Sequence, residues 1–309
     1  MAKNPNFGGF SVGHIHGLNY DNGLLWTSNL YCTIRAVHAK TGETAFMSED
    51  QCIDIPGNGP YNWPGYSGPG KCNIASHPGS LYRKENIVIQ GFCGADLNWG
   101  GRMFMRGYDM NYNPPQEIWT TYMQPPAEGD PDWALRNCAK GWFFSYPAFV
   151  EDGRTGIPCS EVPEENLVND WGVPKHWSSA VSAQWGQQAI DEETGIVYFG
   201  TGNQGGWANQ TWIPGPNLYA GSLVALDAKT GEIVWWYQHV VRDMVEGDSS
   251  WNTILAEIPW NGVQKKVVIK LSTTGLIWML RSRRPRVAFR SLSTNSGGPA
   301  RSTWITTNS

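Results

Sequence analysis

A five-residue sequence occurs twice in the chain, and strand-like residues flank both copies. Ala-Lys-Thr-Gly-Glu is identical at 39–43 and 228–232. The second copy lies between the apolar run 223–226 and the β-branched and aromatic segment 233–237. Glycine adopts a positive φ at low cost, and such flanks are typical of strands. Each copy therefore predicts a tight β-hairpin.

Similar strand–turn–strand units recur at irregular spacing along the chain. Each ends on an aromatic residue in the returning strand, at Phe46, Trp119, Trp235 and Phe289. Hairpin units with a recurring aromatic residue are typical of β-propeller blades, and the spacing fits about four blades of roughly 50 residues plus insertions. We predict an all-β fold, a β-propeller of which about four blades are present.

The composition supports this fold class and excludes others. Only 16% of the 309 residues are charged, while 36 are Gly and 17 are Trp, which suits short strands and tight turns rather than helical bundles or disorder. The formal net charge is −4, but residues 281–309 hold six Arg and no acidic residue. Residues 1–280 therefore carry 17 basic against 27 acidic residues, a charge of −10. An acidic body argues against nucleic acid as a partner.

The composition also suggests domain boundaries. We assign residues 1–280 to a partial propeller with Pro- and Gly-rich insertions at 50–80 and 123–178. After Leu280 another turn with Thr-Gly-Glu is expected, but a basic, Ser- and Thr-rich sequence follows instead. We interpret 281–309 as an atypical tail whose composition resembles a sequence read out of frame.

The six cysteines show no zinc spacing, so disulfides and buried free thiols both stay open. No apolar run approaches the length of a membrane span. The first five residues do not resemble a signal peptide, so an exported protein would begin upstream of Met1.

Oxygen-bearing side chains gather between Gly200 and Trp251. Gly200-Thr-Gly-Asn203 follows one strand, and Asp243, Glu246 and Asp248 follow another. Amide and carboxylate oxygens are the ligands that hard cations prefer, so these loops predict a metal site. A solvated acidic loop is the alternative.

The order of four motifs resembles the quinoprotein alcohol dehydrogenases, the family of methanol dehydrogenase, which use pyrroloquinoline quinone (PQQ). The motifs are Gly94-Ala-Asp96, Trp185-Gly186, Gly200-Thr-Gly-Asn203 and the acids after Tyr237-Gln238. The resemblance covers about residues 10–280 and implies a propeller of the eight-bladed quinoprotein type.

The resemblance also implies the roles of individual residues. Glu246 matches the catalytic base, and Trp185 matches the indole that stacks on the quinone. The implied metal ligands are Asp96, Asn203, Glu246 and Asp248, the last at a position where lanthanide-dependent members carry an additional Asp. The further implied PQQ contacts are His16, Cys93, Gly94, Ala95 and Thr273.

Several positions depart from the family pattern. Asp96 stands in place of a Glu and Glu246 in place of an Asp, so carboxylate chemistry is kept but displaced by a methylene. His16 and Thr273 replace cationic residues that contact PQQ in the family. A family disulfide of adjacent Cys is replaced by Phe10 and Ser11.

The function implied is PQQ-dependent oxidation of a small alcohol. A Ca²⁺ or lanthanide ion assists hydride transfer to the quinone, and a cytochrome c-type acceptor receives the electrons. The implied location is periplasmic or extracytoplasmic, and homo-oligomerisation stays open. The alternative is a non-catalytic PQQ-like propeller, a scaffold or ligand-binding module. A Trp-rich carbohydrate-binding propeller ranks last.

Overall fold

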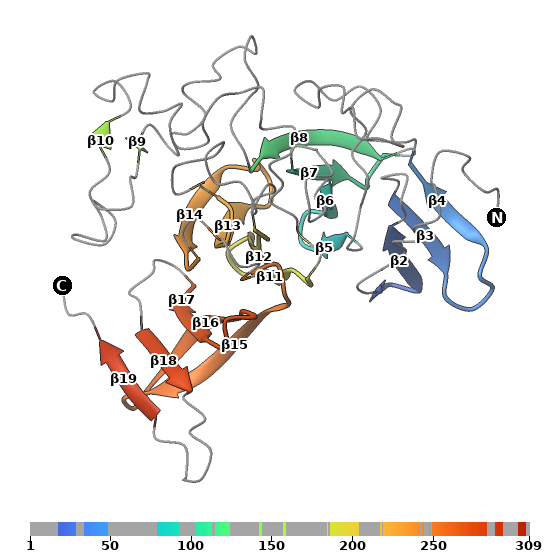
Figure 1. The fold of residues 1–309 in the computed structure, drawn as a ribbon. Coiled ribbons are helices and arrows are strands. Elements are labelled where there is room, and N and C mark those ends of the chain that lie inside the picture. The colour runs from blue at the N-terminus through green and yellow to red at the C-terminus, as the bar shows by residue number, and fades with distance from the viewer. Residues whose placement is uncertain are drawn as a thin grey trace, which may run out of the picture.

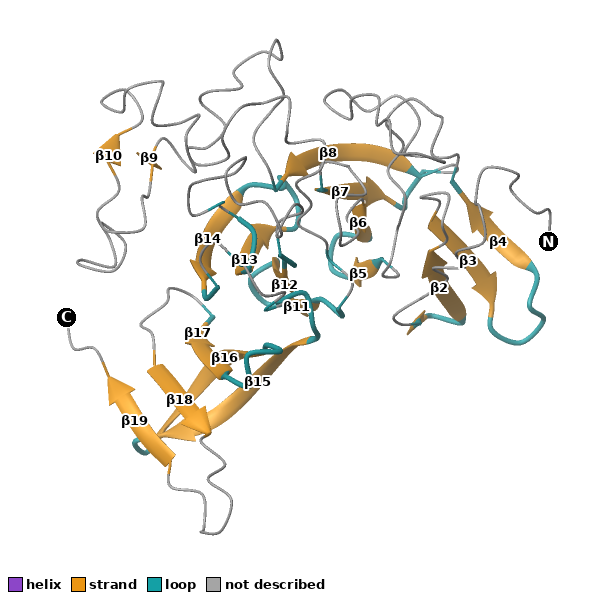
Figure 2. Ribbon diagram, viewed as in Figure 1, coloured by secondary structure: helices purple, strands orange, loops and turns teal. Residues whose placement is uncertain are grey.

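The structure is a computed structural model. It describes residues 18–28, 34–48, 79–92, 103–112, 115–123, 142–143, 157–158, 184, 186–203, 217, 219–240, 243, 247, 249–282, 288–292 and 302–306. Every regular element within these ranges is a β-strand, and all the strand pairs are antiparallel (Figure 2). Within the same ranges, no helix is long and apolar enough to span a bilayer.

Four sheets follow one another along the chain. The first comprises β1 (Asn19–Asp21), β2 (Leu24–Ser28), β3 (Ile34–His38) and β4 (Thr44–Met47). The second comprises β5 (Ser80–Tyr82), β6 (Ile87–Phe92), β7 (Phe104–Asp109) and β8 (Gln116–Tyr122). The third comprises β11 (Ala189–Asp191), β12 (Ile196–Gly200), β13 (Ser222–Asp227) and β14 (Ile233–Gln238).

The fourth sheet has five strands, β15 (Thr253–Trp260), β16 (Val263–Leu271), β17 (Ile277–Arg281), β18 (Ala288–Leu292) and β19 (Ser302–Thr306). A separate pair is formed by β9 (Trp142–Phe143) and β10 (Ile157–Pro158). In every sheet, neighbouring strands are consecutive in sequence. The four sheets lie in an arc, from the blue N-terminal sheet to the red fourth sheet (Figure 1). This meander of successive four-stranded units is the architecture of a β-propeller.

Three apolar cores lie between successive sheets. The first joins Trp26 and Ile34 of the first sheet to Phe92 and Phe104 of the second. Residues of the second and third sheets, among them Ile89, Met105, Phe199 and Leu226, form the next core. The last core contains Tyr198, Leu223, Trp235, Val268 and Leu280, from the third and fourth sheets. The propeller is therefore built from face-to-face contacts between neighbouring blades.

The middle sheets are apolar on both faces because alternate side chains of a strand point to opposite sides. In β6, Val88 belongs to the first core, whereas Ile87 and Ile89 belong to the second. In β12, Tyr198 faces the fourth sheet while its neighbours Val197 and Phe199 face the second. This double burial explains why these strands appear as continuous apolar runs in the sequence.

Both copies of Ala-Lys-Thr-Gly-Glu form the predicted hairpin turns. The first connects β3 to β4 and the second connects β13 to β14. Their glycines, Gly42 and Gly231, have φ values of 74° and 71°. Asp227 caps the second turn by accepting hydrogen bonds from the backbone N–H groups of Lys229 and Thr230, at 2.8 and 3.1 Å.

The repeat-end aromatic residues occupy the strands that the repeat predicts. Phe46, Trp119 and Trp235 lie in β4, β8 and β14, the last strands of the first three sheets. Phe289 lies in β18, which is followed by one further strand, β19. The prediction of an all-β, four-bladed partial propeller is confirmed.

Candidate functional site

The candidate site is centred on the segment that follows β12. Asn203 is 2% exposed and lies three residues beyond the end of that strand. Gly202, beside it, accepts a hydrogen bond of 2.8 Å from the N–H of Gly221. The carbonyl of Gly221 in turn accepts hydrogen bonds from the N–H groups of His239 and Val240, at 3.0 and 3.1 Å. This relay of backbone hydrogen bonds joins the Asn203 segment to the chain that leads into Asp243.

The acid-bearing segment lies directly against the end of β12. A Cβ added to Gly200 would overlap the carbonyl oxygen of Ser249 and the Cε and Nζ atoms of Lys270. Only a glycine lets these backbones approach so closely. The first glycine of Gly200-Thr-Gly-Asn203 thus allows the segment at 249–251 to pack next to the predicted asparagine ligand.

Gly186, the described residue of the Trp185-Gly186 motif, meets the same segment. A Cβ on Gly186 would overlap the backbone of Ser250 and Trp251. The N–H of Gln187 donates a 2.8 Å hydrogen bond to Oδ1 of Asn252, and the N–H of Thr253 donates one of the same length to the carbonyl of Gln187. Two of the sequence motifs, around residues 186 and 200, therefore converge on residues 249–253.

Gly247 lies between the predicted acids Glu246 and Asp248 in the sequence, and in space it lies close to Asp243. The side chain of Asp243 is buried, and its Oδ2 lies 3.1 Å from the position of a Cβ on Gly247. The carbonyl of Gly247 accepts a 2.9 Å hydrogen bond from Oγ of Ser272. Gly247 is thus held close to the β16–β17 turn.

Lys270 is a fully buried cation at this junction. Its exposed fraction is 0%, and its Nζ donates a hydrogen bond to the carbonyl oxygen of Trp251. His239 lies near it, with its ring stacked at 6.2 Å from that of Tyr237 and tilted at 5.5 Å from that of Trp278. Burial lowers the pKa of His239 from 6.5 to about 3, and the positive charge of Lys270 contributes to the same shift. His239 is therefore neutral at neutral pH.

Of the residues to which the family resemblance assigns a role, the structure describes Asn203 and Thr273, and it also describes Asp243 of the acidic loop. Thr273 is exposed in the turn between β16 and β17. The other predicted residues lie outside the described ranges: His16, Cys93, Gly94, Ala95, Asp96, Trp185, Glu246 and Asp248. Phe10, Ser11 and all six cysteines also lie outside them.

The described residues at the junction have the donor chemistry of a hard-cation site. Asn203 and Asp243 supply amide and carboxylate oxygens, and both side chains are almost completely buried. The hydroxyl of Ser249, next to Asp248, is buried and has no hydrogen-bond partner among the described atoms. A bound ligand would satisfy such an oxygen. Within the described ranges no three His, Cys, Asp or Glu side chains cluster, so a cation also needs acids from outside them.

Sequence reasoning missed Lys270 and Ser272. Both are buried and follow the apolar run of β16, Lys270 within the strand and Ser272 directly after it. The signal in the sequence was a lysine within an apolar strand, in Val267-Val-Ile-Lys-Leu271. Lys270 can be assigned to the site only once the segments packed against β16 are known, because its hydrogen-bond partner is the distant Trp251.

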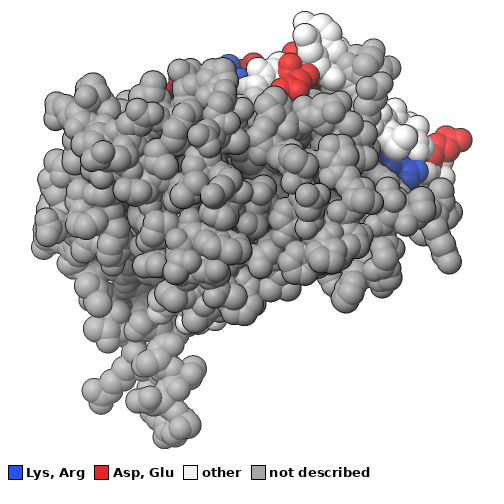
Figure 3. All heavy atoms as spheres, turned by 45° about the horizontal axis from the view of Figure 1, so that its top comes forward, with Lys and Arg blue, Asp and Glu red and all other residues white. Residues whose placement is uncertain are grey.

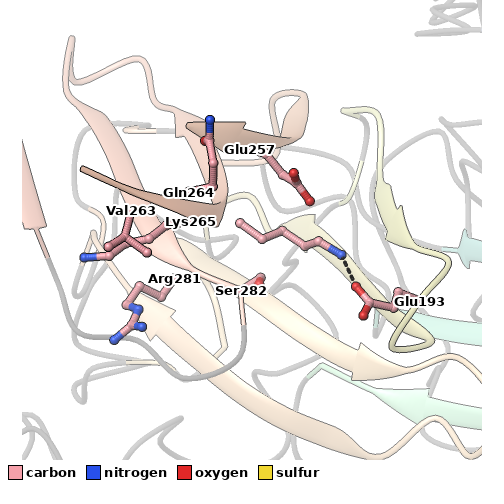
Figure 4. Close-up of a pocket in the computed structure, with 8 residues that line it drawn as sticks. Glu193, Glu257, Val263, Gln264, Lys265, Arg281 and Ser282 are labelled. Carbon is pink, nitrogen blue, oxygen red and sulfur yellow. Dashed lines mark hydrogen bonds and ion pairs between the residues drawn. The ribbon is translucent and has the colours of Figure 1, made fainter. Parts of the chain in front are cut away.

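A separate open cleft of about 620 Å³ lies between the third and fourth sheets (Figure 4). Its lining residues are Glu193, Glu257, Val263, Gln264, Lys265, Lys266, Arg281 and Ser282. Lys266 bridges the third sheet by ion pairs of 2.9 Å to Asp191 and 2.8 Å to Glu193. The cleft contains none of the predicted site residues.

Acidic and basic side chains also mix on the part of the described surface visible in Figure 3. Ion pairs of this kind include Arg106 with Glu117 at 3.2 Å, on the second sheet. Mixed charge of this kind provides no electrostatic reason to assign a nucleic acid as the partner.

The fold is a partial β-propeller, and the comparisons with known proteins relate it to the quinoprotein type. Residues 154–284 match the family model of the glucose/ethanol/alcohol dehydrogenase β-propeller domain. The predicted resemblance to the PQQ-dependent alcohol dehydrogenases is confirmed.

The relatives that match are longer than the chain. Quinohemoprotein alcohol dehydrogenase ADH-IIG of Pseudomonas putida is 29% identical over 59% of this chain and 22% of its own length. Subunit 1 of the methanol dehydrogenase (cytochrome c) of Methylorubrum extorquens is 27% identical over 71% of this chain and 28% of its own length. Among solved structures, a europium-containing methanol dehydrogenase superposes with a TM-score of 0.63 and 21% identity. That match covers 88% of this chain and 40% of that structure. The chain thus spans less than half of each.

Proposed function

We propose that the chain is the metal- and quinone-binding part of a PQQ-dependent dehydrogenase that oxidises a small alcohol. The observation that carries this proposal is the junction at Gly200, where the segment bearing the predicted acids packs against the strand end that leads to Asn203. Ser249, the residue after Asp248, thereby packs against a strand end that is about 50 residues away in sequence, which supports a shared site.

The residues proposed to hold a Ca²⁺ or lanthanide ion are Asp96, Asn203, Glu246 and Asp248. A third carboxylate at Asp248 would better balance a trivalent ion. Trp185 provides a flat indole face for the quinone, and His16, Cys93, Gly94, Ala95 and Thr273 are its further proposed contacts. When bound, PQQ would supply the acceptor for the hydride, and the cation would supply Lewis acidity.

Glu246 is the proposed general base. Its carboxylate would accept the hydroxyl proton of the alcohol, which requires an ionised carboxylate within hydrogen-bond reach of the substrate. Close packing around Gly200 and Gly247 would fix its backbone and so limit displacement of the carboxylate. We further propose a cytochrome c-type acceptor for the electrons and a periplasmic or extracytoplasmic location, in keeping with the cytochrome c named for the Methylorubrum relative.

The proposal is tested by loading the chain with PQQ and either Ca²⁺ or La³⁺ and measuring dye-linked oxidation of short alcohols. We expect turnover with at least one metal, and a loss of about a hundredfold or more in kcat for Glu246→Gln. Glu232→Gln, at an exposed turn acid, is the matched control and should keep full activity. Absence of quinone absorbance and of turnover with both metals would contradict the proposal.

A second candidate function is a non-catalytic PQQ-like propeller that acts as a scaffold or ligand-binding module. The exposed hydroxyl of Thr273 favours it, since this position carries a cation in the family that the motifs resemble. The two candidates differ in metal binding. The dehydrogenase requires that Asn203→Ala lower the metal content of the purified protein, whereas the scaffold requires no change.

A further inference from the structure

Two buried side chains at the end of β16 hold the acid-bearing segment at two points. Oγ of Ser272 donates a 2.9 Å hydrogen bond to the carbonyl of Gly247, and Nζ of Lys270 donates one to the carbonyl of Trp251. The two donors are two residues apart, Lys270 near the end of β16 and Ser272 directly after it. Between them, Leu271 points to the opposite face and is 42% exposed.

The first anchored carbonyl, that of Gly247, lies between the two proposed ligands in the sequence, and Asp248 also lies between the two anchored carbonyls. Glu246 and Asp248 are the immediate neighbours of Gly247, and Ser249 lies between the two anchors. The hydrogen bond from Ser272 therefore fixes the peptide between the proposed base and the proposed third carboxylate. The ammonium nitrogen of Lys270 also lies only 2.5 Å from the position that a Cβ on Gly200 would take, so it connects the segment to the strand that leads to Asn203.

A buried hydrogen bond from a charged donor is strong, and it is lost at considerable cost. Thr274 adds to the anchor at Ser272, because its N–H and its hydroxyl both donate to Oγ of Ser272, at 3.3 and 3.1 Å. These contacts orient the hydroxyl toward Gly247. The anchor at Gly247 therefore depends on both Ser272 and Thr274 of the β16–β17 turn.

We propose that Lys270 and Ser272 are positioning residues of this site, which hold the backbone of residues 247–251 so that Glu246 and Asp248 can share a cation with Asn203. The role in metal binding rests on the proposed function, whereas the hydrogen bonds that anchor the segment do not depend on a metal. Supports of metal ligands that do not touch the metal typically contribute tenfold to hundredfold in affinity.

The test uses the 309-residue chain with Tb³⁺ as a luminescent lanthanide probe that tryptophan can sensitise. We expect Lys270→Met and Ser272→Ala each to weaken Tb³⁺ binding about tenfold to hundredfold. Lys270→Arg, which keeps a cationic donor, should recover part of the loss. Leu271→Ala is the matched control, since it alters the same strand on the exposed face. Tb³⁺ affinities of both variants within about twofold of the unmodified chain would overturn the proposal.

Hydrogen exchange measured without metal tests the anchoring of residues 247–251 separately from metal binding. Amides of residues 243–253 should exchange faster in Lys270→Met and Ser272→Ala, with no change in β6 or β13, whereas a loss of overall stability would raise exchange throughout. Unchanged exchange in 243–253 would overturn the anchoring. If the unmodified chain binds no Tb³⁺, the proposed function fails, and the exchange result alone then decides whether the anchor exists.

Discussion

The indole N–H of Trp119 in the second sheet donates a 3.0 Å hydrogen bond to the carbonyl of Ala228 in the third. Oγ1 of Thr121, two residues further along β8, donates to the carbonyl of Gly231 at 2.6 Å. The third and fourth sheets are joined in a similar way, because the indole N–H of Trp235 donates to the carbonyl of Ser282 at 3.1 Å. The repeat-end tryptophans thus bind the neighbouring sheet as well as filling the core.

Trp119→Phe should destabilise the chain by about 2 kcal/mol. Phenylalanine keeps most of the apolar contact but leaves the buried carbonyl of Ala228 without its donor. Trp119→Ala should cost about 3–5 kcal/mol, because a cavity is added. Urea unfolding monitored by circular dichroism measures both. Trp260→Phe, at a half-buried strand end, serves as the control and should cost less than about 1 kcal/mol. Equal effects at both tryptophans would contradict the docking role.

The two identical turns offer a matched pair of glycine substitutions. Gly231 and Gly42 share their flanking sequence and a positive φ. A Cβ on Gly231 would be 2.5 Å from the Trp119 ring, whereas no described atom would lie within 4 Å of a Cβ on Gly42. Gly42→Ala should cost about 1 kcal/mol for the backbone conformation alone. Gly231→Ala should cost about 2 kcal/mol more, because the indole must move. The difference between the two urea midpoints is the measurement, and equal costs would refute the close packing.

The free energy of unfolding should decrease as the pH is lowered from about 6.5 to 3, because of the titration of His239. The pKa of this buried imidazole is lowered to about 3 in the folded chain, while it is 6.5 in its ordinary state. In this window the unfolded chain binds a proton that the folded chain does not, so acid favours unfolding. His239→Phe should flatten this part of the stability profile, measured as urea midpoints at pH 4 and pH 7. His38→Gln alters an exposed histidine and should leave the profile unchanged.

Asp191 should stabilise the chain above about pH 4. Burial raises the pKa of its carboxyl, but hydrogen bonds from Lys266 and Thr194 outweigh that effect and the net pKa is lowered. A lowered pKa contributes stability that is present above the unfolded value of about 3.9 and is lost as the pH falls through the folded value. Asp191→Asn should therefore be destabilising at pH 7 and less so at pH 3.

The partners of Lys266 provide the control for this ion pair. Lys266→Met should cost about 2 kcal/mol at pH 7, because it leaves the carboxylate of Asp191, whose side chain is 3% exposed, without its cation. Glu193→Gln should cost less than about 1 kcal/mol, since the Glu193 side chain is 66% exposed. A double-mutant cycle of Asp191→Asn and Lys266→Met measures the coupling, and a value near zero would contradict the pair's importance.

The sequence predicts the hairpins of this fold better than the first strand of each sheet. β13 and β14 are apolar and surround a turn with a clear glycine signal, whereas β1 and β5 have only three residues each. Segments this short contain too few residues for a period of two to appear. β15 is longer, but Glu257 and Pro259 interrupt its apolar pattern. Its place as a strand depends on pairing with β16, which local sequence does not encode.

In the candidate site, too, local motifs could be predicted from the sequence, whereas contacts between distant segments could not. The position of Asn203 follows from a local motif after a strand, and its burial agrees with a ligand role. Lys270 and Ser272 could not be assigned in advance, because their partners at Trp251 and Gly247 belong to a different connection. Contacts between distant segments depend on how the sheets stack, and no spacing in the sequence specifies them.

Each apolar core described in this chain is shared by two consecutive sheets, so the sheets differ in how many cores their unfolding disrupts. Of the three cores described, the second and third sheets each contribute to two, whereas the first and fourth each contribute to one. Stability in such a row is a sum over neighbouring contacts. Local opening should therefore start at the outer blades, while the β12–β13 ladder that leads to Asn203 remains among the last parts to separate.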